Sequence, residues 1–170
     1  MKPMLEMMAA YNRWANEKVY ESCGMLSGGE LNRPLGAFFP TVIATLNHLL
    51  AADRIWMRRF TGEGEAPTRL DTILHDNLAD LKAARQAEDQ RIAAFIGLLD
   101  GAQIEGNFTY TPVTTPDPVT QRLGPALVHL FNHQTHHRGQ LHMMLTVLGR
   151  PSLSLDLIYF QRTEEGRRFT

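Results

Sequence analysis

The residues most suited to chemistry in this chain are histidines in its last third. The string from His129 to His142 reads HLFNHQTHHRGQLH. Residues four apart on an α-helix lie about 40° apart around the axis and about 6 Å apart along it, so His133 and His137 would project from one face. Imidazole is a ligand for zinc, nickel, iron and copper, and two imidazoles at this spacing can chelate one ion. The pair therefore predicts a metal site.

Two helical ligands do not complete a site, so a third has to come from another helix. The best candidate is His48, in the string TLNHLLAADRIW, where Ala51 and Ala52 share its helix face and leave room for an ion. Three protein ligands leave positions open for water or a substrate, as in reactive sites. A structural zinc site is usually closed by four ligands, often cysteines, and this chain has a single cysteine, Cys23. That cysteine is interpreted as a small buried hydrophobic residue.

Four further residues are candidates for supporting the ligands or binding a substrate. His129 lies one turn before His133 on the same face, and Gln140, about one turn past the second ligand of the pair, can hold that imidazole in its ligating tautomer. Arg138 offers a guanidinium that could bind a substrate carboxylate or pair with Asp53 across the helices. Other arginines of this region can bind a carboxylate too, but Arg58 and Arg59 are interpreted as solvated or ion-paired.

Two less reactive interpretations stay open beside the enzyme. In one, the protein binds metal without turnover and acts as a stress or interaction protein. In the other, the histidines are a hydrogen-bonded polar network of the core. His136 and His142 point away from the predicted pair, and His75 is expected at the surface.

The overall composition excludes several other function classes. Lys plus Arg is 17 and Asp plus Glu is 18, so the net charge of -1 gives no general attraction to nucleic acid or an anionic membrane. No apolar run approaches the roughly 18–20 residues that span a bilayer. A secretory signal is not expected at the start of the chain, and a single cysteine fits a reducing compartment, so we expect a cytoplasmic protein. No P-loop, Rossmann or H-E-x-x-H motif is present.

Apolar residues recur at helical spacing in four long stretches that Gly and Pro residues separate. The expected long helices cover residues 3–25, 40–61, 70–99 and 125–148, and a short one covers 155–162. The Thr- and Pro-rich stretch 104–122 predicts short extended segments around a turn. The pattern predicts an all-α four-helix bundle in one domain, 1–170, with a hairpin-like insertion before the last long helix.

The third expected helix carries two more specific expectations. Asp71 is its candidate N-cap. Its charged residues are expected in solvent; they are Lys82, Arg85, Glu88, Asp89 and Arg91.

At these motifs the chain resembles the DinB/YfiT-like family of metal-dependent enzymes. The resemblance covers nearly the whole chain and rests on NHLLAADRIWMRRF, on HLFNHQTHHRGQLHMML and on DLIYFQR near the end. It implies a bundle in up-down-down-up order with a right-handed crossover, and a metal held by His48, His133 and His137. Many members of the family are homodimers.

The resemblance also implies a range of chemistry. The family's metal varies, so zinc or nickel is expected first, and iron or manganese as alternatives. Better-understood relatives use low-molecular-weight thiols: maleylpyruvate isomerase, S-transferases that use bacillithiol or mycothiol, and part of the sulfoxide synthases. The sequence-based hypothesis is therefore a metal-dependent enzyme, a thiol-dependent S-transferase or isomerase, that activates an external thiol or water for a small-molecule substrate. The alternative is a non-catalytic metal-binding protein.

Overall fold

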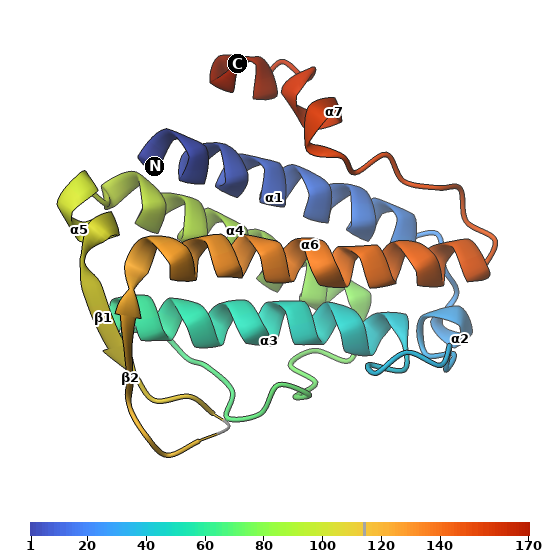
Figure 1. Ribbon diagram of the computed structural model, residues 1–170. Helices are drawn as coiled ribbons and strands as arrows, with labels where there is room; N and C mark the ends of the chain where they lie inside the picture. The colour runs from blue at the N-terminus through green and yellow to red at the C-terminus, as the bar shows by residue number, and fades with distance from the viewer. Residues whose placement is uncertain (114) are drawn as a thin grey trace.

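A computed structural model describes residues 1–113 and 115–170. Four long helices lie side by side (Figure 1); they are α1 (Lys2–Cys23), α3 (Val42–Thr61), α4 (Leu78–Leu98) and α6 (Leu123–Val147). The colours in Figure 1 show that α1 and α6 run in one direction and that α3 and α4 run in the other. The expected all-α bundle is confirmed.

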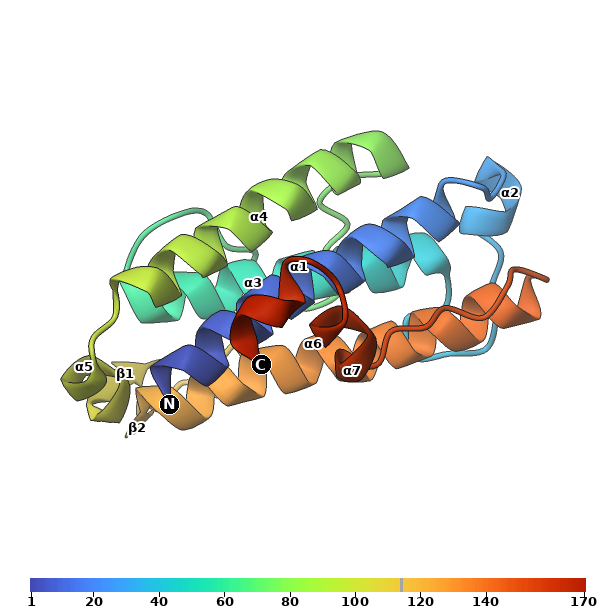
Figure 2. The ribbon, with the colours of Figure 1, turned by 90° about the horizontal axis from the view of Figure 1, so that it is seen from above.

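Shorter elements connect or cover these helices; they are α2 (Gly28–Leu31), α5 (Gly101–Glu105), β1 (Asn107–Tyr110), β2 (Val119–Arg122), α7 (Leu157–Gln161) and the 3₁₀ helix η1 (Gly166–Phe169). The two strands form an antiparallel hairpin before α6, as the sequence predicted, and Thr114 between them lies outside the described residues. The C-terminal segment with α7 and η1 lies across α1 and α6 (Figure 2). None of the described helices is long and apolar enough to span a bilayer.

The expected bounds of the other helices differ by only one or two residues, but the third long helix begins much later than expected. It begins at Leu78, because the Asn77 side chain accepts a hydrogen bond from the backbone N–H of Asp80 and caps the helix. Asp71, the expected cap, is instead bonded to the guanidinium of Arg69 in the preceding loop. The sequence-based prediction therefore extended this helix over residues 70–77, which belong to the loop before it.

That loop, residues 62–77, is the long connection of the bundle. Because α3 and α4 run in the same direction, the chain has to return along the bundle between them (Figure 1). Gly62 ends α3 in the left-handed conformation, with φ of 75°, as expected for a glycine after the last helical residue. The loop thereby passes His48, in the first half of α3.

The core consists of two apolar clusters with a buried polar layer between them along the bundle axis. One cluster includes Leu46, Leu50, Leu81, Leu141 and Met144. The other includes Leu5, Met57, Ile92, Ile96, Leu127 and Leu130. The layer between them takes residues from all four long helices; they are Asn12, Asn16, Asp53, Arg85, Glu88, Asp89, Gln134 and Arg138.

The polar layer corrects the expectation that the charges of α4 are solvated. Arg85, Glu88 and Asp89 are buried, because they continue the face of α4 that carries Leu81 and Ile92. Arg85 Nη1 lies 2.7 Å from Asp53 Oδ2, and Arg85 Nη2 lies 3.0 Å from Asp89 Oδ1. The buried charges are therefore paired, as burial of an ion requires.

Candidate metal centre

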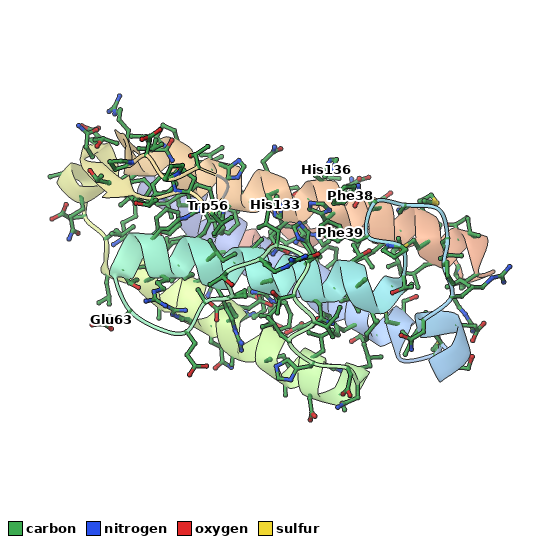
Figure 3. The ribbon with its side chains drawn as sticks, turned by 90° about the horizontal axis from the view of Figure 1, so that it is seen from below. Phe38, Phe39, Trp56, Glu63, His133 and His136 are labelled. Atoms are coloured by element: carbon green, nitrogen blue, oxygen red, sulfur yellow. The ribbon has the colours of Figure 1, made fainter. Side chains whose placement is uncertain are left out.

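Three histidines from two helices meet between α3 and α6. His48 lies on α3, and His133 and His137 lie on α6. Each offers one ring nitrogen, and these nitrogens lie within 4.8 Å of one another. Figure 3 shows His133 between the two helices, on the side of the bundle opposite the C-terminal segment. The structure thus brings together the three residues that the spacing singled out.

The outer nitrogens of two of these rings are held by carbonyl oxygens. His48 Nδ1 lies 2.8 Å from the backbone oxygen of Leu70, in the long loop. His137 Nδ1 lies 2.7 Å from Oε1 of Gln140, one turn further along α6. Carbonyl oxygens only accept, so both Nδ1 atoms carry the hydrogen and both Nε2 atoms carry a lone pair. This is the tautomer in which a histidine ligates a metal through Nε2.

The lone pairs converge on one point. His48 Nε2 lies 3.2 Å from His133 Nε2 and 3.1 Å from His137 Nε2. Between His48 and His137 no hydrogen is left to join the two nitrogens, so the contact is repulsive unless a cation lies between them. With metal–nitrogen bonds of about 2.0–2.1 Å, neighbouring ligands are about 3.3 Å apart in a tetrahedral centre and about 2.9 Å apart in an octahedral one. The separations fit a bound transition metal.

The pKa values of the three imidazoles keep them in the ligating, neutral form. Burial, followed by repulsion from the other two imidazoles, lowers the pKa of His133 to about 3. Burial lowers the pKa of His137 to about 4, although its hydrogen bond to Gln140 acts in the opposite direction. Burial also lowers the pKa of His48. At His133 and His137, protons therefore compete with a metal only in strongly acidic solution.

Sequence reasoning did not find the residues that hold His48 in place. Phe39, just before α3, stacks on the His48 ring with centroids 3.8 Å apart. Asn47, buried beside His48, accepts hydrogen bonds from the backbone N–H groups of Leu74 and His75 and donates to the backbone oxygens of Ile43 and His75. Asn47 therefore fixes the long loop against α3, which places the Leu70 oxygen at the imidazole. An asparagine next to a ligand gives no sequence signal for this role.

The four expected supporting residues fall into two groups. Gln140 contacts a ligand directly, through the hydrogen bond to His137. His129 is exposed, and its ring centroid is 6.0 Å from that of His133 and 5.1 Å from that of Trp56.

Arg138 and Asp53 belong to the buried polar layer instead. The expected direct pair between them is wrong, because Arg138 donates to Asn12 and Asn16, while Asp53 is paired with Arg85. Gln134, the residue after His133, connects the metal centre with the buried polar layer, because its Nε2 donates to Asp53 at 2.6 Å. Arg138 is thus occupied within the core and is not free to bind a substrate carboxylate.

The remaining histidines lie away from the three nitrogens. His142 lies 2.9 Å from the Ser152 hydroxyl through Nε2, and His136 is exposed on the outer side of α6 (Figure 3). His75 is only partly exposed, in the loop before α4 rather than at the start of the helix. His142 lies away from the pair, as expected, and His136 offers no nitrogen to the group, although its ring packs against that of His137 with centroids 4.8 Å apart.

A sequence model described as the DinB family matches residues 1–168. The chain belongs to the DinB family. A relative from Bacillus subtilis (strain 168), named Protein DinB, is 24% identical over 167 residues, which cover 92% of this chain and 94% of the relative. Membership of the DinB family and the buried three-histidine group together fit a metal-binding protein.

Proposed function

We propose that this DinB-family protein is a divalent-metal-dependent enzyme that activates an external thiol, or water, at His48, His133 and His137. A thiol-dependent S-transferase or isomerase is the reaction class that we favour. The observation that carries the proposal is the set of three converging Nε2 atoms, two of which are deprived of a hydrogen by carbonyl partners at Nδ1. Such an arrangement needs a cation at its centre.

The chain's own groups would hold and shape this centre. The carbonyl oxygens of Leu70 and Gln140 orient two ligands, and the ring of Phe39 covers His48 and excludes water from that side. Three protein ligands leave coordination positions for a substrate. A bound divalent metal supplies a lowered pKa to a coordinated thiol or water, which makes it nucleophilic at neutral pH.

An external nucleophile is favoured because the protein offers no suitable thiol of its own. Cys23 is the single cysteine, and its side chain is 0% exposed. Burial raises the pKa of its thiol to about 12, so almost no thiolate exists at neutral pH. The cysteine lies among apolar residues of the core, in accord with its interpretation as a buried hydrophobic residue.

The three-imidazole donor set favours zinc or nickel as the metal, and iron or manganese are the alternatives. The first test is metal content by mass spectrometry on protein purified without a metal-affinity tag. We expect about one transition metal per chain, and none in a His133→Ala, His137→Ala double variant with unchanged helicity. His142→Ala is the matched control, because it removes a histidine of the same helix outside the site. Protein that stays metal-free after incubation with all four ions would refute the proposal.

Turnover separates the enzyme from the alternative, a metal-binding protein without catalysis. The metal-loaded protein is expected to consume low-molecular-weight thiols in the presence of an electrophile, and the double variant is not. If the metal is bound tightly but no thiol is consumed with any electrophile of a panel, the non-catalytic alternative replaces the enzyme. We further propose a cytoplasmic homodimer, and light scattering during size-exclusion chromatography tests the oligomeric state.

A further inference from the structure

The guanidinium of Arg59 lies beside two aromatic rings near the C-terminal end of α3. Its guanidinium carbon lies 4.5 Å from the ring centroid of Trp56, on α3, and 4.5 Å from that of Tyr110, on β1. The centroids of these two rings are only 5.3 Å apart, so both rings lie on the same side of the guanidinium, and its N–H groups are left for a partner. The side chain is half-buried.

No carboxylate of the described residues lies within ion-pair distance of Arg59. Elsewhere in the same bundle, the buried Arg138 has the amide oxygens of Asn12 and Asn16 as partners, whereas Arg85 and Arg54 have acidic partners, Asp53 and Glu88. Burial without such a partner lowers the pKa of the Arg59 guanidinium. Cation–π contacts with the two rings offset only part of the cost of removing the guanidinium from water. An anion bound from outside would supply the missing partner of opposite charge.

The space beside Arg59 is a cleft of about 660 Å³, open to solvent, between the end of α3, the long loop and the hairpin. A second cation and several hydroxyl-bearing residues line it; they are Arg58, Thr68, Thr109, Tyr110 and Thr111, and Ile55 contributes an apolar wall. A volume of this size is in the usual range for small-molecule sites. The lining suits a small anion with an apolar portion.

The cleft and the histidines share one face of α3. His48, Ile55 and Arg59 follow one another at seven and then four residues, so they lie on one side of the helix. Between His48 and Trp56 the helix axis advances by about 12 Å. His129 contacts both Trp56 and His133, and Figure 3 shows Trp56 and His133 along the same side of the bundle.

We propose that Arg59 binds the carboxylate of an extended small-molecule substrate whose reactive group reaches the three histidines. The carboxylate would pair with the guanidinium, while the rest of the molecule extends past Trp56 and His129 toward His133. The assignment to a substrate rests on the proposed function, whereas carboxylate binding in the cleft does not. The substrate class is thus a carboxylate-bearing molecule with roughly 10 Å between its carboxylate and its reacting atom.

The first experiment uses metal-free protein and therefore does not depend on the metal centre. The chain has two tryptophans, so a ¹H–¹⁵N spectrum contains two indole signals, which a Trp14→Phe variant assigns. Titration with glutarate is expected to shift the Trp56 signal and leave the Trp14 signal in place. Arg59→Gln should weaken this binding at least tenfold. Arg167→Gln, which removes an equal charge from the exposed C-terminal segment, should not change it.

Unchanged glutarate binding in Arg59→Gln, or no shift of Trp56 in the unaltered protein, would overturn carboxylate binding at this site. A second experiment tests the connection to the histidines in zinc-loaded protein. We expect 8-mercaptooctanoate to bind at least tenfold more tightly than 3-mercaptopropionate, and Arg59→Gln to abolish most of that advantage. An advantage that survives in Arg59→Gln would show that the cleft and the metal centre do not serve one substrate.

Discussion

The lowered pKa values of His133 and His137 predict a pH-dependent loss of stability in the metal-free protein. Their folded-state values are about 3 and about 4, whereas an unfolded histidine titrates near 6.5. As the pH falls, the unfolded state therefore takes up protons first, and the free energy of unfolding decreases. The contribution of these two histidines to stability is therefore greatest above about pH 7.5 and declines below that pH.

The size of the effect follows from proton uptake by the unfolded chain. At pH 5.5 each of the two histidines favours unfolding by about 1.4 kcal/mol, and at pH 7.5 by about 0.1 kcal/mol. The two together cost about 2.6 kcal/mol between these pH values. Both folded-state values lie well below 5.5, so the result depends on the unfolded-state pKa and only weakly on the extent of burial.

Urea unfolding followed by circular dichroism, with all metal removed, measures this loss at pH 7.5 and 5.5. A His133→Gln, His137→Gln double variant serves as the control, because it keeps every other titrating group. We expect the unaltered protein to lose about 2.6 kcal/mol more than the double variant. A difference below about 1 kcal/mol would refute the conclusion that these imidazoles are neutral in the folded state.

Three substitutions test the groups that support the site and the core. Gln140→Leu removes the acceptor of an imidazole N–H and should lower metal affinity about 10- to 100-fold in a competition with a chromophoric chelator, whereas Gln140→Glu should preserve it. Asn47→Ala removes three hydrogen bonds between α3 and the long loop and one within α3, so urea unfolding at pH 7.5 should show a loss of about 2–4 kcal/mol. Arg85→Met leaves two buried carboxylates without their cation and should cost about 3–5 kcal/mol, against less than about 0.5 kcal/mol for Arg167→Met. A loss of under 1 kcal/mol in either core variant would contradict the pairing described for it.

Local patterns were sufficient to predict the long helices and the histidine group. Apolar residues at helical spacing give the helices, and an i, i+4 pair such as His133 and His137 has one geometry on any α-helix. His48 needed a further inference, since nothing in the spacing says which face of α3 meets α6. The structure brings all three together.

Contacts between distant segments could not be predicted in this way. Arg85 and Asp89 continue the apolar face of α4, but a charged residue at such a position is usually solvated, and only the partners on α1 and α3 explain its burial. The ring of Tyr110 reaches Arg59 only because the hairpin folds back onto the end of α3. For this reason Arg59 was interpreted as solvated or ion-paired, whereas it is half-buried beside two rings.

The buried polar layer has a consequence for how the protein acquires its metal. A shift of one helix along its axis by a single turn, about 5.4 Å, would separate the paired charges of the layer and leave them buried without partners. Gln134, the residue after His133, fixes α6 against Asp53 of α3, so the heights of the ligands on the two helices are set without an ion. The apoprotein is therefore expected to be folded already when the ion arrives. The metal then binds to a preformed site, and ions can exchange at the centre without refolding of the protein. The concentration of each available ion in the cell would therefore govern which one is bound.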